Sequence, residues 1–405
     1  MPTSDADTHR PGPERSRPMS RPPGRPAAGS LAADPSPAFA ADPDIDLSRA
    51  TWRKSLTDAV HRALDRFVAD RCVPELRAAH LHVAADVLTA FLDGGKCLRP
   101  TFLYLGWRCG AHAPASDSAA AVRAAASLEL LHAFALLQDD VMDAAALRRG
   151  RPTAHLTFAR WHRGRGLPGC SDRFGESAAV LLGDLCLVWA GQMLRDSGMP
   201  ASALGRAWPR YDRMRTELAI GQFGDLTTAD PADGRPPTLA AVLAVARRKS
   251  GHYTVTRPLE IGAALAGCPH DVLTVLTGYG HAVGEAFQLR DDLLDLLGSP
   301  AVTGKPAAGD LREGKYTSVV AAAYRLADAA ARRRLRALIG APHLDEDDIR
   351  GWRELIIATG AVDLVERMID MRLARSLALI EDARITPDVR TALADMAIAC
   401  TERAA

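Results

Sequence analysis

Apolar residues recur at every third or fourth position along most of this 405-residue chain. Val60, Leu64, Phe67 and Val68 illustrate the spacing, which gathers side chains on one face of an α-helix. The same pattern predicts helices over residues 119–143, 176–197, 202–222, 238–249, 251–266, 271–297, 315–338 and 361–382. Short breaks containing Gly or Pro separate these segments, and no run of alternating β-branched residues competes with them. The pattern therefore predicts an all-α fold in which long helices form a bundle.

The first part of the chain has a different composition. Residues 1–48 contain 10 of the 26 prolines and lack any apolar periodicity. A segment of this kind cannot bury enough apolar surface to offset the entropy of ordering it. We therefore expect a disordered tail over 1–48 and one folded domain over 49–405.

Charge and cysteine content restrict the possible partners and location. The 50 basic and 49 acidic residues leave a net charge of +1, so no bulk electrostatic attraction toward nucleic acid is expected. The seven cysteines lie far apart without a CxxC pair, which favours a reducing, cytoplasmic location. No signal-peptide pattern is visible, and Arg and Asp interrupt the apolar stretches, so we expect no membrane-spanning segment.

A cluster of carboxylates lies at the end of one predicted helix, in the stretch LLQDDVMD. Asp139 and Asp143 are four residues apart on one helix face, and Asp140 is displaced from Asp139 by about 100°. Their carboxylates can converge on one point. Clustered oxygen ligands suit Mg²⁺, which commonly takes its remaining ligands from water and from substrate phosphate.

A second cluster repeats the same spacing in the stretch FQLRDDLLD, at Asp291, Asp292 and Asp295. Both clusters follow an apolar helical segment. Two such clusters facing each other across a helical bundle would hold several metal ions around one polyphosphate. The repetition therefore favours a metal and diphosphate site over two solvated acidic helix ends.

Several basic residues lie in the sequence where a diphosphate site would need them. Only five of the 50 basic residues are lysines, and four of these lie beside Gly or near the carboxylates, where an ammonium group can meet phosphate oxygens. These four are Lys96, Lys249, Lys305 and Lys315. Arg99 shares the stretch GGKCLRP with the first of them, and Arg148 and Arg149 follow the first Asp cluster.

Together these motifs resemble the trans-isoprenyl diphosphate synthases of the polyprenyl synthetase family. The resemblance covers roughly residues 55–400 and rests on GGKCLRP, LLHAFALLQDDVMDAAALRRGRPTAH, LLGDL, GQFGDL, KSGHYTV and FQLRDDLLDLLG followed by TGKPAAGDLREGKYT. It implies a helical bundle around a central apolar cavity and a homodimer. The implied reaction joins isopentenyl diphosphate to an allylic diphosphate, head to tail, to give a short-chain isoprenyl diphosphate.

The resemblance also implies roles for individual residues. Three Mg²⁺ ions per active site would be bound by Asp139, Asp140, Asp143, Asp291, Asp292 and Asp295. The allylic diphosphate would contact Arg148, Lys249 and Lys315. The diphosphate of isopentenyl diphosphate would contact Lys96, Arg99, His132 and Arg149. Lys305 would close over the site, while Gln222, Ser250 and Gln288 would lie near the developing allylic cation.

Two alternative functions share parts of this pattern. A class I terpene cyclase also ionises an allylic diphosphate, but usually pairs one Asp-rich cluster with an Asn/Ser/Glu triad and lacks a second diphosphate site. A silent subunit of a heteromeric prenyl synthase commonly loses one Asp cluster. Because both clusters are intact here, the pattern favours an active prenyltransferase.

Product length depends on side chains below the first Asp cluster. Ala135 lies one helical turn from Asp139, and its methyl group leaves that level open. Phe134 is expected to narrow the cavity from the side. By resemblance, this arrangement predicts geranylgeranyl diphosphate as the main product, with farnesyl diphosphate as the alternative.

Overall fold

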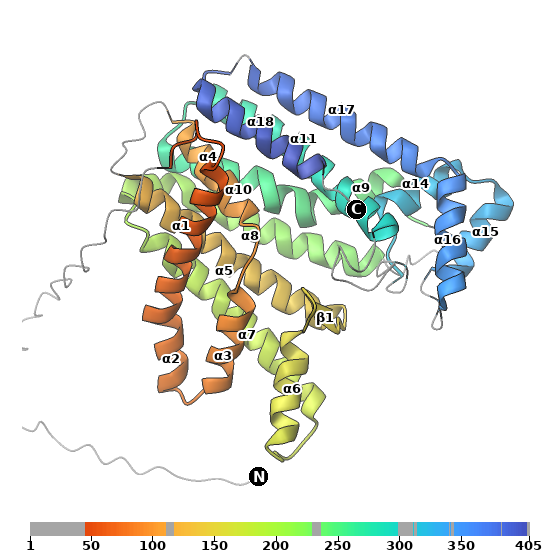
Figure 1. The fold of residues 1–405 in the computed structure, drawn as a ribbon, viewed down its shortest axis with the longest axis horizontal. Coiled ribbons are helices and arrows are strands. Elements are labelled where there is room, and N and C mark those ends of the chain that lie inside the picture. The colour runs from red at the N-terminus through yellow and green to blue at the C-terminus, as the bar shows by residue number, and fades with distance from the viewer. Residues whose placement is uncertain are drawn as a thin grey trace, which may run out of the picture. The chain divides into compact units, whose positions relative to one another are not determined.

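The computed structural model describes residues 45–110, 117–228, 236–298, 311, 314–339, 341, 344–381 and 383–402, which are almost entirely helical (Figure 1). In chain order, the first helices are α1 (Trp52–Phe67), η1 (Val68–Cys72), α2 (Val73–Ala78), α3 (His82–Leu92), α4 (Leu98–Arg108), α5 (Ser118–Met142), α6 (Ala154–Gly164) and α7 (Ser171–Arg195). They are followed by α8 (Ala201–Thr228), α9 (Leu239–Ala246), η3 (Arg247–Thr256), α10 (Arg257–Ala266), α11 (His270–Leu297), α14 (Ser318–Leu326), α15 (Ala329–Leu338), α16 (Glu346–Ala358), α17 (Ala361–Glu381) and α18 (Pro387–Thr401). The elements η1 and η3 are π-helical. The predicted all-α fold is confirmed.

Two predicted boundaries differ from the structure because of local backbone contacts. The break expected at residue 250 is absent, since α9, η3 and α10 follow one another without interruption. Gly251 in η3 instead packs against the backbone of Gly284 in α11, where a Cβ atom would come within 3.1 Å. Conversely, the helix expected over 315–338 is divided, because Asp328 caps the start of α15 by accepting a hydrogen bond from the Ala331 amide.

The start of the packed chain also differs from the predicted boundary. Residues 1–44 lie outside the described part of the chain. Ile45 and Leu47 are buried in the main core, and Arg108 donates a hydrogen bond to the Ile45 carbonyl. Residues 45–48 therefore belong to the packed region, because these two apolar side chains are held against the bundle.

The helix α5 runs through the main core. Its alanine-rich first half allows neighbouring helices to approach closely, and it packs against α7, α4 and α1. The expectation that Arg and Asp interrupt every long apolar stretch was wrong for α5 and α7, which are both long and apolar enough, by length and composition, to cross a membrane. In α5, 72% of the apolar window is buried inside the protein, and in α7 the share is 50%. The apolar character of α5 is thus accounted for by its central position.

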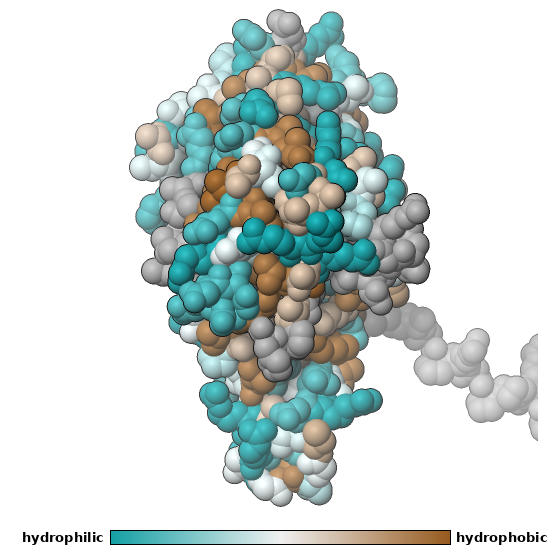
Figure 2. Space-filling model, turned by 90° about the vertical axis from the view of Figure 1, so that its right-hand side faces the viewer, coloured by the Kyte–Doolittle hydropathy of each residue, from teal (hydrophilic) through white to brown (hydrophobic). Residues whose placement is uncertain are grey.

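A second core cluster lies toward the end of α11, where α14, α15, α16 and α17 pack around it. Trp352 and Leu335 are fully buried there. Figure 2 shows the face that carries α15 and α16, where apolar side chains gather along the middle and polar ones lie on both sides. The two clusters hold the end of α5 and the end of α11 in fixed positions.

A short hairpin follows α5 and was not predicted. The strands β1 (Leu147–Arg148) and β2 (Arg151–Pro152) pair antiparallel. The two residues between them, Arg149 and Gly150, have φ values of +52° and +73°. Two positive φ angles are typical of the tight type I′ hairpin turn. The turn holds Arg148 and Arg149 beside the end of α5.

Candidate active site

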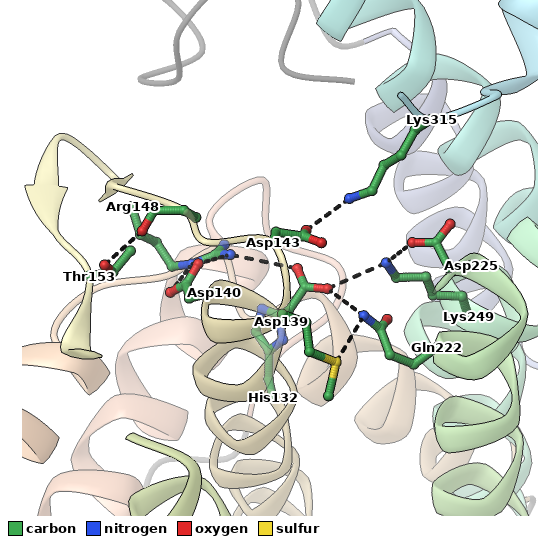
Figure 3. Close-up of polar contacts among 12 residues, drawn as sticks. His132, Asp139, Asp140, Asp143, Arg148, Thr153, Gln222, Asp225, Lys249 and Lys315 are labelled. Atoms are coloured by element: carbon green, nitrogen blue, oxygen red, sulfur yellow. Dashed lines mark hydrogen bonds and ion pairs between the residues drawn. The ribbon is translucent and has the colours of Figure 1, made fainter. Parts of the chain in front are cut away.

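The first Asp cluster occupies the C-terminal end of α5, where each carboxylate contacts a cation (Figure 3). Arg148 donates three hydrogen bonds to Asp140, at 2.6, 2.8 and 2.9 Å. Lys315 Nζ lies 2.8 Å from Asp143 Oδ2. Lys249 Nζ lies 3.4 Å from Asp139 Oδ1. Because the carbonyl end of a helix disfavours negative charge, these cations stabilise the cluster.

The carboxylates of this cluster differ in their electrostatics. Asp140 is only 1% exposed, and burial raises its pKa despite the pairing with Arg148. Burial also acts to raise the pKa of Asp139. The charges of Lys249, Lys315 and Arg148 outweigh burial there, so the pKa of Asp139 lies below its ordinary value. Asp139 is therefore ionised at neutral pH.

The second Asp cluster lies on α11, and its buried member Asp292 accepts hydrogen bonds from uncharged donors. Asp292 Oδ2 accepts hydrogen bonds from the Ser318 amide at 2.8 Å and from the Ser318 hydroxyl at 2.5 Å. Asp292 Oδ1 accepts one from Gln288 at 2.8 Å. Burial raises the pKa of Asp292 to about 6. Asp292 thus faces the start of α14, while Asp291 faces the cavity and Asp295 lies one turn further along α11.

A cavity of about 460 Å³ lies between the two helix ends. It brings together most of the residues predicted from the sequence: Lys96, Arg99, His132, Ala135, Asp139, Arg148, Arg149, Gln222, Lys249, Ser250, Gln288 and Asp291. Other predicted residues contact the site or each other without lining this cavity, namely Asp140, Asp143, Asp292 and Lys315, and Asp295 does not line it either. Lys305 lies outside the described residues.

The donor chemistry of the site fits a hard cation. All six predicted ligands are carboxylates, and oxygen ligands of this kind suit Mg²⁺ better than a soft metal. Within the described residues, no three His, Cys, Asp or Glu side chains converge as a preformed metal site. Figure 3 shows the side chains of Arg148, Lys249 and Lys315 beside the carboxylates of the first cluster.

A further group of basic side chains lines the cavity near the start of α4. Arg99 donates a hydrogen bond to the Thr254 hydroxyl at 3.0 Å, and its guanidinium lies 4.3 Å from the centre of the Tyr253 ring. His132 lies beside them on α5. Burial, followed by the charges of Arg99, Arg148 and Arg149, lowers the pKa of His132 well below its ordinary value. His132 is therefore neutral at pH 7 and contributes hydrogen bonding rather than charge.

Several residues that line the cavity or bind a lining residue were not predicted as part of the site. Asp225 binds Lys249, with 2.5 Å between Oδ2 and Nζ. The sequence offered a signal for the position of Asp225 but not for its partner, because Asp225 follows Gln222 by three residues and therefore shares its face of α8. Glu129, Tyr253 and Thr254 also line the cavity. Tyr253 and Thr254 belong to the same motif segment as Lys249, and Glu129 directly precedes the segment that contains His132.

Ala135 and Phe134, the two side chains expected to control product length, lie on different faces of α5. Ala135 lines the cavity one turn below Asp139. Phe134 is half-buried against the main core and is not among the lining residues. It lies four residues from Gln138, which donates a hydrogen bond to Asp184 in α7. Phe134 therefore shares the α5 face that turns toward α7.

The comparisons with known proteins agree with this geometry. Residues 82–356 match the family described as Polyprenyl synthetase. The chain is 32% identical to a geranylgeranyl diphosphate synthase of Mycobacterium tuberculosis over 361 residues, which are 87% of this chain and 94% of the relative. It is 34% identical to a geranylfarnesyl diphosphate synthase of Aeropyrum pernix over 276 residues, which are 67% of this chain and 79% of the relative.

A solved structure is similar over most of the chain. It is a geranylgeranyl pyrophosphate synthase from Corynebacterium glutamicum, complexed with isoprenyl diphosphate and magnesium. The sequence identity is 37% and the TM-score is 0.80, with 87% of this chain and 99% of that chain covered. The helical fold is thus shared with an enzyme whose structure contains isoprenyl diphosphate and magnesium.

Proposed function

The chain belongs to the polyprenyl synthetase family and is a prenyltransferase, and we propose that it condenses isopentenyl diphosphate with an allylic diphosphate to make geranylgeranyl diphosphate. The observation that carries this proposal is the 460 Å³ cavity, whose lining contains carboxylates with their paired cations and a further group of basic side chains near the start of α4. A reaction between two diphosphates needs two such groups.

The first group is assigned to the allylic diphosphate. Arg148, Lys249 and Lys315 supply positive charge around the end of α5, and each contacts a carboxylate there. Mg²⁺, when bound, would stabilise the negative charge that develops on the departing diphosphate. The six predicted carboxylates, three on α5 or its end and three on α11, would hold it.

The second group is assigned to isopentenyl diphosphate. Lys96, Arg99 and Arg149 supply charge, and neutral His132 supplies a hydrogen bond. The rigid hold on Arg99 by Thr254 and Tyr253 fixes the direction of its guanidinium. This group therefore orients the double bond of isopentenyl diphosphate toward the allylic carbon.

The middle of the cavity suits a carbocation. Gln222, Ser250 and Gln288 present oxygen atoms that stabilise positive charge and are weak nucleophiles. Leu136 and Phe287 line the same space and exclude water, which would otherwise quench the cation. Formation of the new C–C bond leaves a carbocation on the isopentenyl unit, and this carbocation loses a proton to the released diphosphate. No protein nucleophile is required.

We assign the product to the twenty-carbon class because Ala135 leaves the level below Asp139 open. Two compared enzymes bear the name geranylgeranyl synthase, which supports this length. The test is incubation of the purified protein with Mg²⁺, isopentenyl diphosphate and each short allylic diphosphate, followed by chain-length analysis. Farnesyl diphosphate as the dominant product would contradict the assignment, and the absence of any elongation would contradict the function.

We also propose a homodimer in the cytoplasm. Large apolar side chains are exposed on α7 at Leu181 and Val188, and on α8 at Ile220 and Phe223. Such side chains are commonly covered by a partner. All seven cysteines are free thiols, which fits a reducing compartment. Light scattering tests the assembly by comparing the mass of the wild type with the masses of the Leu181→Lys and Phe223→Lys variants. If both variants have the same mass as the wild type, an interface on these helices is contradicted.

A further inference from the structure

A second cavity of about 590 Å³ lies between η3, α11 and α17. Its lining residues are Arg247, His252, Gly278, His281, Ala282, Glu285, Met371, Arg372 and Arg375. None of these residues lines the cavity that contains the Asp clusters. The two cavities are therefore different sites.

The charge of this second cavity is positive. Glu285 is the one acidic residue of its lining, against three arginines, which leaves a net charge of +2 when both histidines are neutral. Glu285 accepts a hydrogen bond from Arg247 Nε at 2.6 Å and another from Arg372 Nε at 2.7 Å. Arg375 is exposed and has no hydrogen-bond or ion-pair partner among the described residues. Glu285 thus fixes two guanidinium groups at the wall, and Arg375 adds an uncompensated third.

The two histidines form the deeper part of the lining. The rings of His252 and His281 are stacked, with their centres 4.9 Å apart. His252 Nδ1 lies 3.1 Å from Glu217 Oε2, while His252 Nε2 is buried without a hydrogen-bond partner in the described part of the chain. Glu217 and Glu260 lie behind the cavity and are both paired with the buried Arg257. The acidic groups nearest the cavity are therefore already compensated.

The second cavity shares a wall with the catalytic one. In η3, Lys249 and Ser250 line the catalytic cavity, whereas Arg247 and His252 line the second. A Cβ atom on Gly251 would come within 3.1 Å of the Gly284 backbone, so η3 is packed tightly against α11. π-helical segments are frequent at functional sites. The segment η3 thus presents cations to both sides.

We propose that the second cavity is a binding site for a phosphate or diphosphate group. Arginine side chains match phosphate oxygens through paired N–H donors, and the three here surround one concave space. Ala282 and Met371 add apolar surface beside them. The shared chemistry therefore admits either free inorganic diphosphate or the diphosphate end of a prenyl chain. This site lies beyond the proposed catalytic function.

Calorimetric titration of the full-length protein with inorganic diphosphate tests the proposal without any readout of turnover. In the wild type we expect a further class of binding site besides the two diphosphate groups of the catalytic cavity. Arg375→Ala weakens this further class about tenfold, which corresponds to the loss of one charge-assisted contact. Arg99→Ala weakens catalytic-cavity binding and leaves the further class unchanged. Because Arg375 is exposed, its removal leaves the fold intact, and circular dichroism verifies this.

Arg367→Ala is the matched control, since Arg367 is another exposed arginine of α17 that does not line the cavity. It is expected to bind diphosphate as the wild type does. The proposal is overturned if Arg375→Ala and the double variant Arg372→Ala/Arg375→Ala both retain wild-type binding, or if Arg367→Ala causes the same loss. A thio-diphosphate analogue of a prenyl substrate distinguishes the two ligand sources: tighter binding than inorganic diphosphate, sensitive to Arg375→Ala, assigns the apolar lining to the hydrocarbon chain.

Discussion

The two Asp clusters have the same sequence spacing but different surroundings. In the first cluster, on α5, each carboxylate contacts a cation, and these contacts come from the hairpin, from η3 and from the residues before α14. In the second, on α11, Asp292 is bound by Ser318 and Gln288, which are both uncharged. A repeated motif therefore specifies which side chains meet, while the elements packed around it determine their charge state.

The different surroundings of the two clusters give Asp139 and Asp292 different pKa values. Asp139 has a lowered pKa and is ready to bind a cation at neutral pH. Asp292 has a pKa raised to about 6, because it is buried among neutral donors. Binding of a cation near Asp292 is accordingly coupled to the loss of a proton around that pH. Asp139 is thus a preorganised anion, and Asp292 becomes one as its proton leaves.

The largest expected effect comes from removing either cluster. Asp139→Ala and Asp291→Ala should each reduce turnover by about three orders of magnitude, because one cluster alone leaves charge on the departing diphosphate uncompensated. Steady-state rates, with circular dichroism as a check of the fold, measure this. Asp184→Ala is the control, since Asp184 contacts Gln138 and does not line the cavity. Near-normal turnover in either cluster variant would refute the paired-cluster mechanism.

Substitutions of the cations around the first cluster and of those near α4 should affect different substrates. Lys315→Ala removes the partner of Asp143 and should raise the KM for the allylic diphosphate about tenfold. Arg99→Ala should raise the KM for isopentenyl diphosphate by a similar factor, leaving the allylic KM nearly unchanged. Substrate-dependence curves for each variant test the assignment. An equal rise in both KM values in both variants would contradict it.

A smaller effect is expected for Asp292, in how the free energy of unfolding of the metal-free protein depends on pH. The folded pKa of Asp292 is about 6 and the ordinary value is 3.8. The folded state therefore binds this proton more tightly, and stability falls as pH rises between these values. Asp292→Asn removes that loss, so its free energy of unfolding relative to wild type should rise by about 1 kcal/mol from pH 5 to 7.5.

Asp139→Asn provides the contrast, measured by urea unfolding with a chelator present. The pKa of Asp139 is lowered in the folded protein, so its contribution to stability is present above pH 3.8 and is lost at lower pH. The difference between Asp139→Asn and wild type should therefore stay constant from pH 5 to 7.5. The comparison of the two clusters fails if both variants show the same pH dependence.

Much of this molecule could be predicted from local patterns. The period of apolar residues identified the long helices, and the spacing of Asp139 and Asp291 placed both at the cavity. The contact between Ser318 and Asp292 could not be predicted, because it joins residues that only the packing of α14 on α11 brings together. The same holds for the bond between Asp225 and Lys249.

Local geometry also limited the prediction. The hairpin at Arg148 and Arg149 has strands of two residues each, too short for any alternating pattern to appear. Phe134 was expected to narrow the cavity because of its angle to Ala135 on a helical wheel. Such a wheel gives the angles between side chains but does not show which neighbouring helix each one faces. The contact of Gln138 with Asp184 shows that this side of α5 faces α7.

The smallest expected effect is on product length, where the two clusters differ again. One turn below Asp139 lies Ala135, and one turn below Asp291 lies Phe287, and both line the cavity. The α5 side is therefore open at this depth, while the α11 side is filled by a ring. Ala135→Phe should close the level and shift the products toward shorter chains, whereas Phe287→Ala should widen it and shift them toward longer ones.

Phe134→Ala is the matched test for direction, because Phe134 is adjacent in sequence but faces α7. Its product distribution should change less than that of Ala135→Phe, with turnover of all three variants remaining within about tenfold of wild type. Reversed-phase separation of the dephosphorylated products measures the chain lengths. A larger shift in Phe134→Ala than in Ala135→Phe would mean that the growing chain extends along the α7 side of α5, and the floor of the cavity would then have to be assigned to that face.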